Sequence, residues 1–424
     1  MGVASSPAPA ALRWFLLLGA ILTPFNYFGG VPVGEITLHP LQLWAILLVM
    51  LMLVLSPRTI LEAADAPPLL LWTMFAFVAA STAFGTAEEY RLRGFLDASL
   101  LAINLAAFTL AYGQLRSDPA GWASFARVLY AASLLSSGIL VVRALLLARS
   151  GVFVLPDSYQ LGLGTVTGTF TTAFAAASVA GMIFARSRGL RLWMVPGIFV
   201  HGMAASLALA RGPWVAGAVA VAATCALAVR FLPGVKAVAR ALGRAVVALL
   251  LLASSVVSAV LVNPTVGLLI ASRALQITDL GGGTGRARLI LFRALWDDAV
   301  DSPVFGHGAA TYRRVSELLQ VQGSISENFL LEMLHAGGAM AALPLALAAT
   351  IVIVRVTRAL GEPTGVGVAS ACLAGALALM LGALTNPAAW DTAFWILLAA
   401  AVTLRPAILP PNLLPNPAPE VATP

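Results

Sequence analysis

The sequence predicts an all-α membrane protein, a polytopic bundle of about 12 transmembrane helices with one large helical loop outside the bilayer. Three properties of the composition lead to this prediction. Apolar residues make up 60% of the 424 residues, charged residues make up 10%, and the mean hydropathy is +0.93. Soluble domains carry about 25% charged residues, so a soluble globule is excluded.

Twelve apolar stretches are long enough to cross a hydrocarbon core of ~30 Å, which takes about 20 helical residues. They cover residues 12–31, 38–56, 67–84, 94–115, 120–148, 163–185, 190–210, 212–230, 242–262, 326–354, 364–384 and 390–405. Arg13 precedes the first stretch, which continues without the small-residue cleavage pattern of a signal peptide. We therefore interpret it as the first span.

The order of these stretches predicts four regions. Residues 1–262 hold transmembrane helices 1–9, 263–325 form the large loop, 326–405 hold transmembrane helices 10–12, and 406–424 form a proline-rich, disordered tail. Cys225 and Cys372 lie within apolar stretches without metal-ligand spacing. We expect them to be free thiols and find no signature of a metal site.

Basic residues are distributed unevenly between the two sides of the predicted bundle. The side that holds the N-terminus carries Arg13, Arg58, Arg116, Arg186, Arg188, Arg191, Arg230, Lys236, Arg240, Arg244, Arg355, Arg358 and Arg405. The short loops of the other side carry Arg91, Arg93, Arg143, Arg149 and Arg211. The positive-inside rule thus predicts cytoplasmic termini and an extracytoplasmic 263–325 loop. Basic residues divided in this way do not indicate nucleic-acid binding.

The loop is predicted to contain a helix from Arg286 to Asp301, preceded by a glycine-rich hinge at 281–285 and ended by Ser302-Pro303. At ~100° per residue, one face of this helix is apolar. That face holds Leu289, Phe292, Leu295, Trp296 and Ala299, whereas the opposite face holds Arg286, Arg293, Asp297 and Asp301. We interpret Arg286 and Arg293 as charges of a solvated face.

Arg288 falls among the apolar residues of that helix. An arginine on a docking face is costly unless it meets an anion or a carboxylate there. Two interpretations stay open: Arg288 binds a ligand, or it makes a structural salt bridge or snorkels to the interface. Arg211, between two spans with almost no loop, is either an anchor at the membrane boundary or a charge that projects into a cavity.

The segments after the loop helix hold further candidates. His307, in the turn Ser302 to Gly308, is either a proton carrier or a hydrogen-bonding loop residue. Ser326 is the expected N-cap of the tenth span, with Glu327 in its first turn, where an acid also compensates the helix dipole.

Two further features lie within the tenth span. Glu332 and His335, three residues apart, are interpreted as a structural pair inside the span. The Gly337-Gly338 step allows a kink or close packing.

These segments together resemble the O-antigen ligase and polymerase superfamily. The resemblance rests on 210–214 (Ala-Arg-Gly-Pro-Trp), on 288–292, on the turn 302–308 and on Glu327-Asn328-Phe329-Leu330 followed by Gly337-Gly338. It covers about 210–340 by motif and the whole chain by topology. Its members are multipass glycosyltransferases that act on undecaprenyl diphosphate-linked glycans at the periplasmic face.

The resemblance implies roles for individual residues. Arg211 and Arg288 match the arginines that engage the lipid diphosphate, and Glu327 stands where the ligases have a histidine. That departure favours a polymerase of O-antigen or exopolysaccharide repeat units over a ligase that joins glycan to lipid A-core. Arg286, Arg293, His307 and Asn328 are the expected substrate-binding residues.

A single displacement on the anomeric carbon would invert its configuration and needs neither metal nor cofactor, with arginines on the diphosphate and Glu327 as base. The expected place is the bacterial inner membrane, with the site facing the periplasm. A secondary transporter is the alternative of another class, although no internal repeat is apparent.

Overall fold

A computed structural model describes residues 10–26, 31–33, 36–55, 65–149, 165–262, 264–277, 283–319, 328–361 and 366–404. Within these ranges the protein is helical apart from one antiparallel pair of strands. The N-terminal elements are α1 (Ala10–Leu22), η1 (Thr23–Phe25), β1 (Val31–Val33), β2 (Ile36–Leu38), α2 (Pro40–Leu55), α4 (Ala66–Gly85), α5 (Glu88–Ser117) and α6 (Pro119–Arg149). The middle of the chain forms α7 (Thr165–Phe184), α8 (Arg188–Leu207), α9 (Arg211–Ala228), η3 (Val229–Phe231) and α10 (Val235–Val262). The remaining elements are α11 (Pro264–Leu275), α12 (Gly283–Asp301), α13 (Tyr312–Leu318), α14 (Phe329–Ala359), α15 (Val366–Ala383), η4 (Pro387–Trp390) and α16 (Thr392–Val402).

Nine helices of the described chain are long and apolar enough to cross a membrane: α4 to α10, α14 and α15. The predicted all-helical bundle is confirmed, and these nine helices are consistent with a multi-pass membrane protein. The predicted spans 12–31, 38–56 and 390–405 coincide with α1, α2 and α16, which have 13, 16 and 11 residues. At 1.5 Å per residue, even α2 covers only about 24 Å, so the number of twelve stays a prediction.

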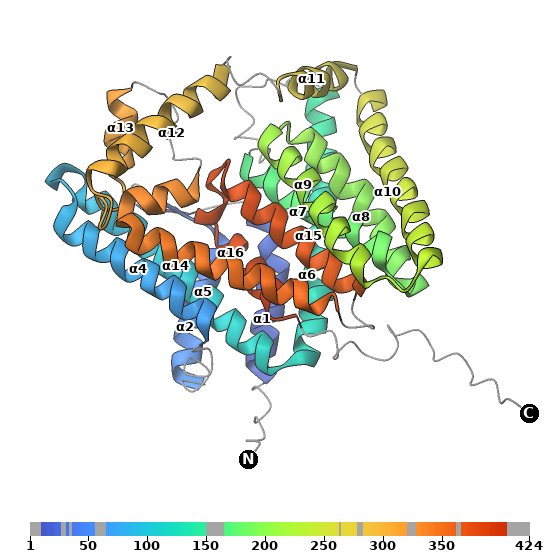
Figure 1. Cartoon of the computed structure of the whole chain (residues 1–424), viewed down its shortest axis with the longest axis horizontal. Helices are drawn as coiled ribbons and strands as arrows, with labels where there is room; N and C mark the ends of the chain where they lie inside the picture. Colours follow the sequence, from blue (N-terminus) through green and yellow to red (C-terminus); the bar gives the residue numbers. More distant parts are fainter. Residues whose placement is uncertain are drawn as a thin grey trace, which may run out of the picture.

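The two ends of the bundle differ. Helices α11, α12 and α13 all lie at one end, α12 beside α13 and α11 beside α10; we call this end the loop side (top in Figure 1). The opposite end, which we call the base side, holds Asp65, Arg116 and Arg355 in mutual contact. The three loop helices fall within the predicted loop 263–325, whereas the predicted tail 406–424 lies outside the described residues.

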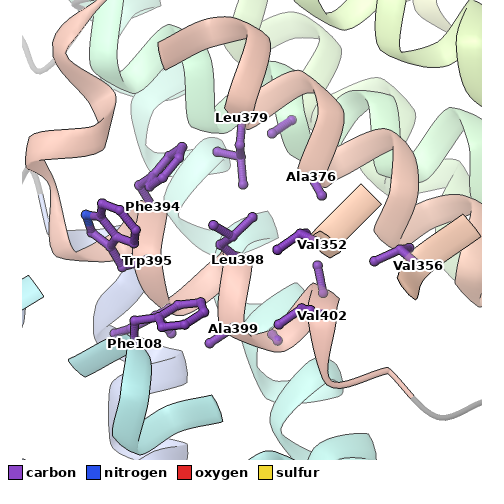
Figure 2. Packing of buried hydrophobic residues seen from close by; sticks show 14 of the residues in the cluster. Phe108, Val352, Val356, Ala376, Leu379, Phe394, Trp395, Leu398, Ala399 and Val402 are labelled. Carbon is purple, nitrogen blue, oxygen red and sulfur yellow. The ribbon is translucent and has the colours of Figure 1, made fainter. Parts of the chain in front are cut away.

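Helix α16 lies at the centre of the packed core. Figure 2 shows its apolar side chains between those of α5, α14 and α15. Trp395 illustrates the packing, because its ring meets Phe108 of α5 and Phe329 of α14 edge to face, at centroid distances of 6.1 and 6.0 Å. The helix is capped by Asp391, which accepts hydrogen bonds from the backbone amide of Ala393 and from the side chain of Asn26. A helix of this length enclosed by neighbours needs such polar anchors, because its terminal groups do not reach the bilayer surface.

An ion-pair network closes the base side. Arg355 donates to both carboxylate oxygens of Asp65 at 2.8 and 3.0 Å, and Arg116 donates to one of them at 2.6 Å. Tyr112 also hydrogen-bonds to that carboxylate, and Asp65 caps α4 through the amide of Ala66. The hydrogen bond from Arg355 holds the pKa of the Asp65 carboxyl well below its usual value, although partial burial opposes this effect. The network therefore joins α4, α5 and α14.

Replacing Asp65 by asparagine is expected to lower the free energy of unfolding by about 2 kcal/mol, between the values typical of exposed and buried pairs. Asparagine preserves the helix cap, so the loss reports the ion pairs and the hydrogen bond from Tyr112. Folding lowers the pKa of the Asp65 carboxyl. The difference in the free energy of unfolding between wild type and Asp65→Asn is therefore complete above the unfolded-state pKa of Asp65 and disappears as pH falls through its folded-state pKa.

Thermal unfolding of the purified protein at neutral and acidic pH measures this difference. Asp297→Asn is the control, because Asp297 is exposed and 3.9 Å from Arg293. Equal effects of the two substitutions would contradict the assigned role of Asp65.

Candidate functional site

The loop segment that follows α12, residues 302–308, is hydrogen-bonded to a break in α14. Gly338 has φ +63° and ψ −161° inside that helix, so the neighbouring backbone groups lose their helical partners. The loop segment supplies replacements: the amides of His307 and Gly308 donate to the carbonyls of His335 and Ala336, both at 2.8 Å. In the other direction, residues 339 and 340 of α14 donate to the carbonyls of residues 303 and 304. Of the two features that Gly337-Gly338 allows, a kink or close packing, α14 shows the kink, and the loop segment supplies hydrogen-bond partners to the backbone there.

Close backbone approach explains the glycines of this segment. Gly306 and Gly308 have φ +67° and +89°, a region that favours glycine. A Cβ on Gly306 would lie 2.6 Å from backbone atoms of His335, Ala336 and Gly338. Ala310 also has positive φ, +66°, which is uncommon for a residue with a side chain. The turn is therefore held in one conformation against α14.

Two histidines and an aspartate meet at this junction, which we call the His–Asp cluster (Asp298, His307, Thr311 and His335). The Nε2 of the buried His335 lies 2.7 Å from the Oδ2 of Asp298, and its Nδ1 lies 3.4 Å from Thr311 Oγ1. His307 Nε2 lies 2.8 Å from the carbonyl oxygen of Asp298, and the two imidazole rings are 5.2 Å apart. The cluster fixes the end of α12 on α14.

A second group of charges lies beside it, which we call the carboxylate–arginine cluster (Arg93, Asp97, Arg313 and Glu332). Asp97 and Glu332 are only 6% and 2% exposed. Arg93 Nε is 3.1 Å from Asp97 Oδ1, and Arg313 interacts electrostatically with both carboxylates. Burying a carboxylate without a nearby cation is costly. Charged residues buried within membrane spans commonly mark a functional site, so this cluster is a candidate functional site.

Neighbouring aromatic residues complete the carboxylate–arginine cluster. Trp390 Nε1 donates to Glu332 Oε2 at 2.9 Å, which connects the cluster to the turn before α16. Burial raises the pKa of Tyr312 above its usual value, so its hydroxyl stays protonated at neutral pH. The cluster therefore joins α5, α13, α14 and the α15–α16 connection.

A groove runs between α12 and α14 on the loop side, which we call the α12–α14 groove. Its volume is about 630 Å³. It is lined by Leu289, Phe292, Arg293, Trp296, Asn328, Leu330, Leu331, Leu334, Ala342, Leu343 and Ala346. Nine of these residues are apolar, and Arg293 and Asn328 are the polar ones. An apolar groove with a few polar groups is the usual form of a ligand site.

Helix α12 begins at Gly283, three residues before the predicted start, and ends at Asp301 as predicted. The predicted orientation of its apolar face needs a correction. Leu291 and Leu295 are buried, whereas Leu289 and Trp296 are half exposed and line the groove. Arg288 is half-buried and lies one turn before Leu291, on the docking side of the helix as predicted. The buried stripe is rotated about the helix axis relative to the predicted face, because it includes Leu291, which the predicted face did not hold, and leaves Leu289 and Trp296 at the groove.

The two candidate arginines occupy different positions. Arg211 is the first residue of α9, and its guanidinium donates to the carbonyl of Gln276, after α11, at 2.5 Å. Arg288 lies on α12. Neither residue lines the α12–α14 groove. The structure thus ties Arg211 to the chain that leads into α12, without a described contact between the two arginines.

The start of α14 differs from the prediction. Its N-cap is Asn328, whose Oδ1 accepts from the amide of Leu331 at 3.0 Å, and not Ser326. Glu327 therefore precedes the N-cap instead of lying in the first turn. Its placement lies outside the described residues. Asparagine is as good a cap as serine, so a sequence with both left the choice open.

The remaining predicted residues lie at several different places. Arg293 and Asn328 come together in the groove, and Arg293 is 87% exposed. Arg286 is exposed and lies outside the groove lining. His307 belongs to the His–Asp cluster. Glu332 and His335 were expected to pair with each other, which is wrong, because their hydrogen bonds go to Trp390 and Asp298.

Sequence reasoning missed Asp298, Asp97 and Arg313. One signal was present for Asp298, which lies two turns after the buried Leu291 and therefore on the same face. An acid on a docking face needs a partner, and His335 is that partner. No local pattern pointed to Asp97 or Arg313, because their partners come from helices distant in the sequence.

The comparisons with known proteins leave the family open. No protein-family model matches the chain, and no curated protein shows a significant match to it.

Proposed function

We propose that the protein transfers a glycan from undecaprenyl diphosphate to an acceptor sugar hydroxyl on the loop side, in the periplasm of a bacterial cell. In this proposal it polymerises the repeat units of a surface polysaccharide. The α12–α14 groove is the observation that carries the proposal. It offers apolar surface to a polyprenyl tail and places Arg293 and Asn328 at its polar positions. A lipid-linked anion needs this combination.

The arginines of α12 supply the charge that the departing diphosphate needs. Arg286, Arg288 and Arg293 lie within one stretch of that helix, about 11 Å along its axis at 1.5 Å per residue. Guanidinium groups bind phosphate oxygens bidentately and stay charged, so they stabilise the leaving group as the glycosidic bond to phosphate breaks.

Arg211 belongs to the same proposal through its contact with Gln276. Gln276 precedes Gly283, the first residue of α12, by seven residues, which limits their separation to about 25 Å. Attack by the acceptor oxygen forms the new bond at the anomeric carbon, and the proton of that hydroxyl passes to a base. Glu327, next to the cap of α14, is the residue that we assign as the base.

Filling the groove is expected to slow transfer. Ala346→Trp places a large side chain among the groove residues, so KM for the lipid-linked donor should rise about tenfold or more, as expected for a blocked apolar site. The assay uses purified protein in liposomes with an undecaprenyl diphosphate-linked glycan and follows chain lengthening on gels.

Leu347→Trp is the matched control, because Leu347 is the next residue, is half exposed and does not line the groove. Wild-type protein without transfer would overturn the proposed function. Active wild type with an unaffected Ala346→Trp variant would overturn the role of the groove alone. Uptake of labelled glycan into the same liposomes without lengthening would instead indicate a transporter.

A further inference from the structure

A second groove lies in the base-side half of the bundle, between α6, α7, α8, α15 and α16. Its volume is about 410 Å³, within the usual range of ligand sites of roughly 300–1,000 Å³. Alanine, glycine, leucine and aromatic residues form most of its lining, and Arg127 is the one charged residue among the described residues that line it. The groove is separate from the α12–α14 groove, because the two share no residue.

Arg127 is an exposed arginine within a predicted span. It lies eight residues after the start of α6, about 12 Å along the helix. Its Nε donates to the carbonyl of Ala123 at 3.2 Å, and the described part of the chain offers it no ion pair. Four guanidinium N–H groups therefore remain for another acceptor. A cation at this depth is expected to have an anionic partner or to reach the membrane surface.

Aromatic residues beside Arg127 indicate the depth of this position. Trp193 of α8 lines the groove and is 56% exposed, and Tyr130 lines it one turn beyond Arg127. Tryptophan and tyrosine concentrate at the level of lipid head groups. The guanidinium is thus placed where a lipid phosphate lies, and the apolar part of the groove lies where acyl chains lie.

We propose that this groove binds one anionic phospholipid, with its phosphate on Arg127 and one acyl chain along the apolar lining. Charge complementarity selects this occupant. Basic residues crowd the same end of the neighbouring helices: Arg191 and Arg244 act on each other electrostatically, and Arg244 donates to the carbonyl of Ala185 at 2.8 Å. A head group with net negative charge suits this surface, whereas a zwitterionic head group adds a further cation to it.

Native mass spectrometry of the purified, delipidated full-length protein tests the proposal. The protein is titrated with phosphatidylglycerol and, separately, with phosphatidylcholine. We expect one phosphatidylglycerol to bind about tenfold more tightly, because both lipids carry the phosphate but only phosphatidylcholine adds a cation beside Arg127. Arg127→Gln should remove this preference. Gly375→Phe, which fills the groove and leaves Arg127 in place, should weaken the binding of both lipids.

Arg240→Gln is the matched control. Arg240 is also exposed at the base side and also donates its Nε to the carbonyl four residues earlier, at 3.2 Å, but it does not line the groove. The preference should survive this change and the addition of inorganic phosphate. Retained preference in Arg127→Gln, an equal loss in Arg240→Gln, or displacement by phosphate would each overturn the proposal. Thermal unfolding of each variant verifies that it is folded, and Gly375→Phe tests the groove independently of Arg127.

Discussion

Replacement of Gly338 by alanine is expected to destabilise the protein by about 3 kcal/mol or more. The residue has φ +63°, which costs a residue with a side chain of the order of 1–3 kcal/mol. A Cβ there would also lie 2.2 Å from the carbonyl oxygen of Val304 and 2.6 Å from the amide nitrogen of Phe305. Both contacts are to backbone, so no side-chain rotation relieves them. The loop segment would have to leave the break in α14, and the His–Asp cluster would separate.

The measurement is the unfolding temperature of the purified variant, together with its yield from membranes. Gly243→Ala in α10 is the matched control, because a Cβ at Gly243 meets nothing within 4 Å. In that helix alanine is favoured over glycine by about 1 kcal/mol, so the control should be equally or more stable. A Gly338→Ala variant with the wild-type unfolding temperature would contradict the described junction.

Alanine in place of Arg288 or of Arg211 is expected to reduce glycan transfer by about a hundredfold or more each. The reason is that each guanidinium would act on charge that develops on the diphosphate in the transition state, where one donor is typically worth 10²–10³-fold. The loss should appear in kcat, because the interaction strengthens as the bond breaks. Initial rates with the undecaprenyl diphosphate-linked donor in liposomes measure this effect.

Arg314→Ala serves as the control for these variants. Arg314 is an exposed arginine of α13 on the same side of the bundle, and the proposed mechanism gives it no role. Its removal tests whether any loss of basic charge on the loop side slows transfer. Near-normal turnover of Arg288→Ala or Arg211→Ala would remove the role of that arginine, whereas equal losses in all three would indicate a general electrostatic effect.

Features that depend on nearby residues were predictable from the sequence. The long apolar runs gave nine of the spans, Ser302-Pro303 gave the end of α12, and Gly337-Gly338 gave the kink in α14. Each is governed by hydrophobic length or by backbone conformation within a few residues. Arg116 and Arg355, both predicted on the side of the N-terminus, indeed lie at one end, because both contact Asp65.

Features that depend on tertiary partners were not predictable in this way. The half-buried Arg288 lies on the expected side of α12, yet Leu289 and Trp296 line a groove that a helical wheel alone does not reveal. Glu332 and His335 have the spacing of a pair, but Trp390 and Asp298 are nearer partners in the fold. The sequence offers two good N-cap residues for α14, Ser326 and Asn328, and no nearby residue decides between them. The structure uses Asn328.

The central position of α16 has a consequence for biogenesis. Helices α5, α14 and α15 pack their apolar faces on a helix that follows all of them in the chain. During translation those faces meet lipid or a chaperone until α16 emerges. With only 11 residues, α16 is too short to cross the bilayer as an independent span, so we expect it to enter the bilayer together with α15. We therefore expect the bundle to be completed late, after insertion of the other helices, and a nascent chain that stops after α15 to be cleared by membrane proteases.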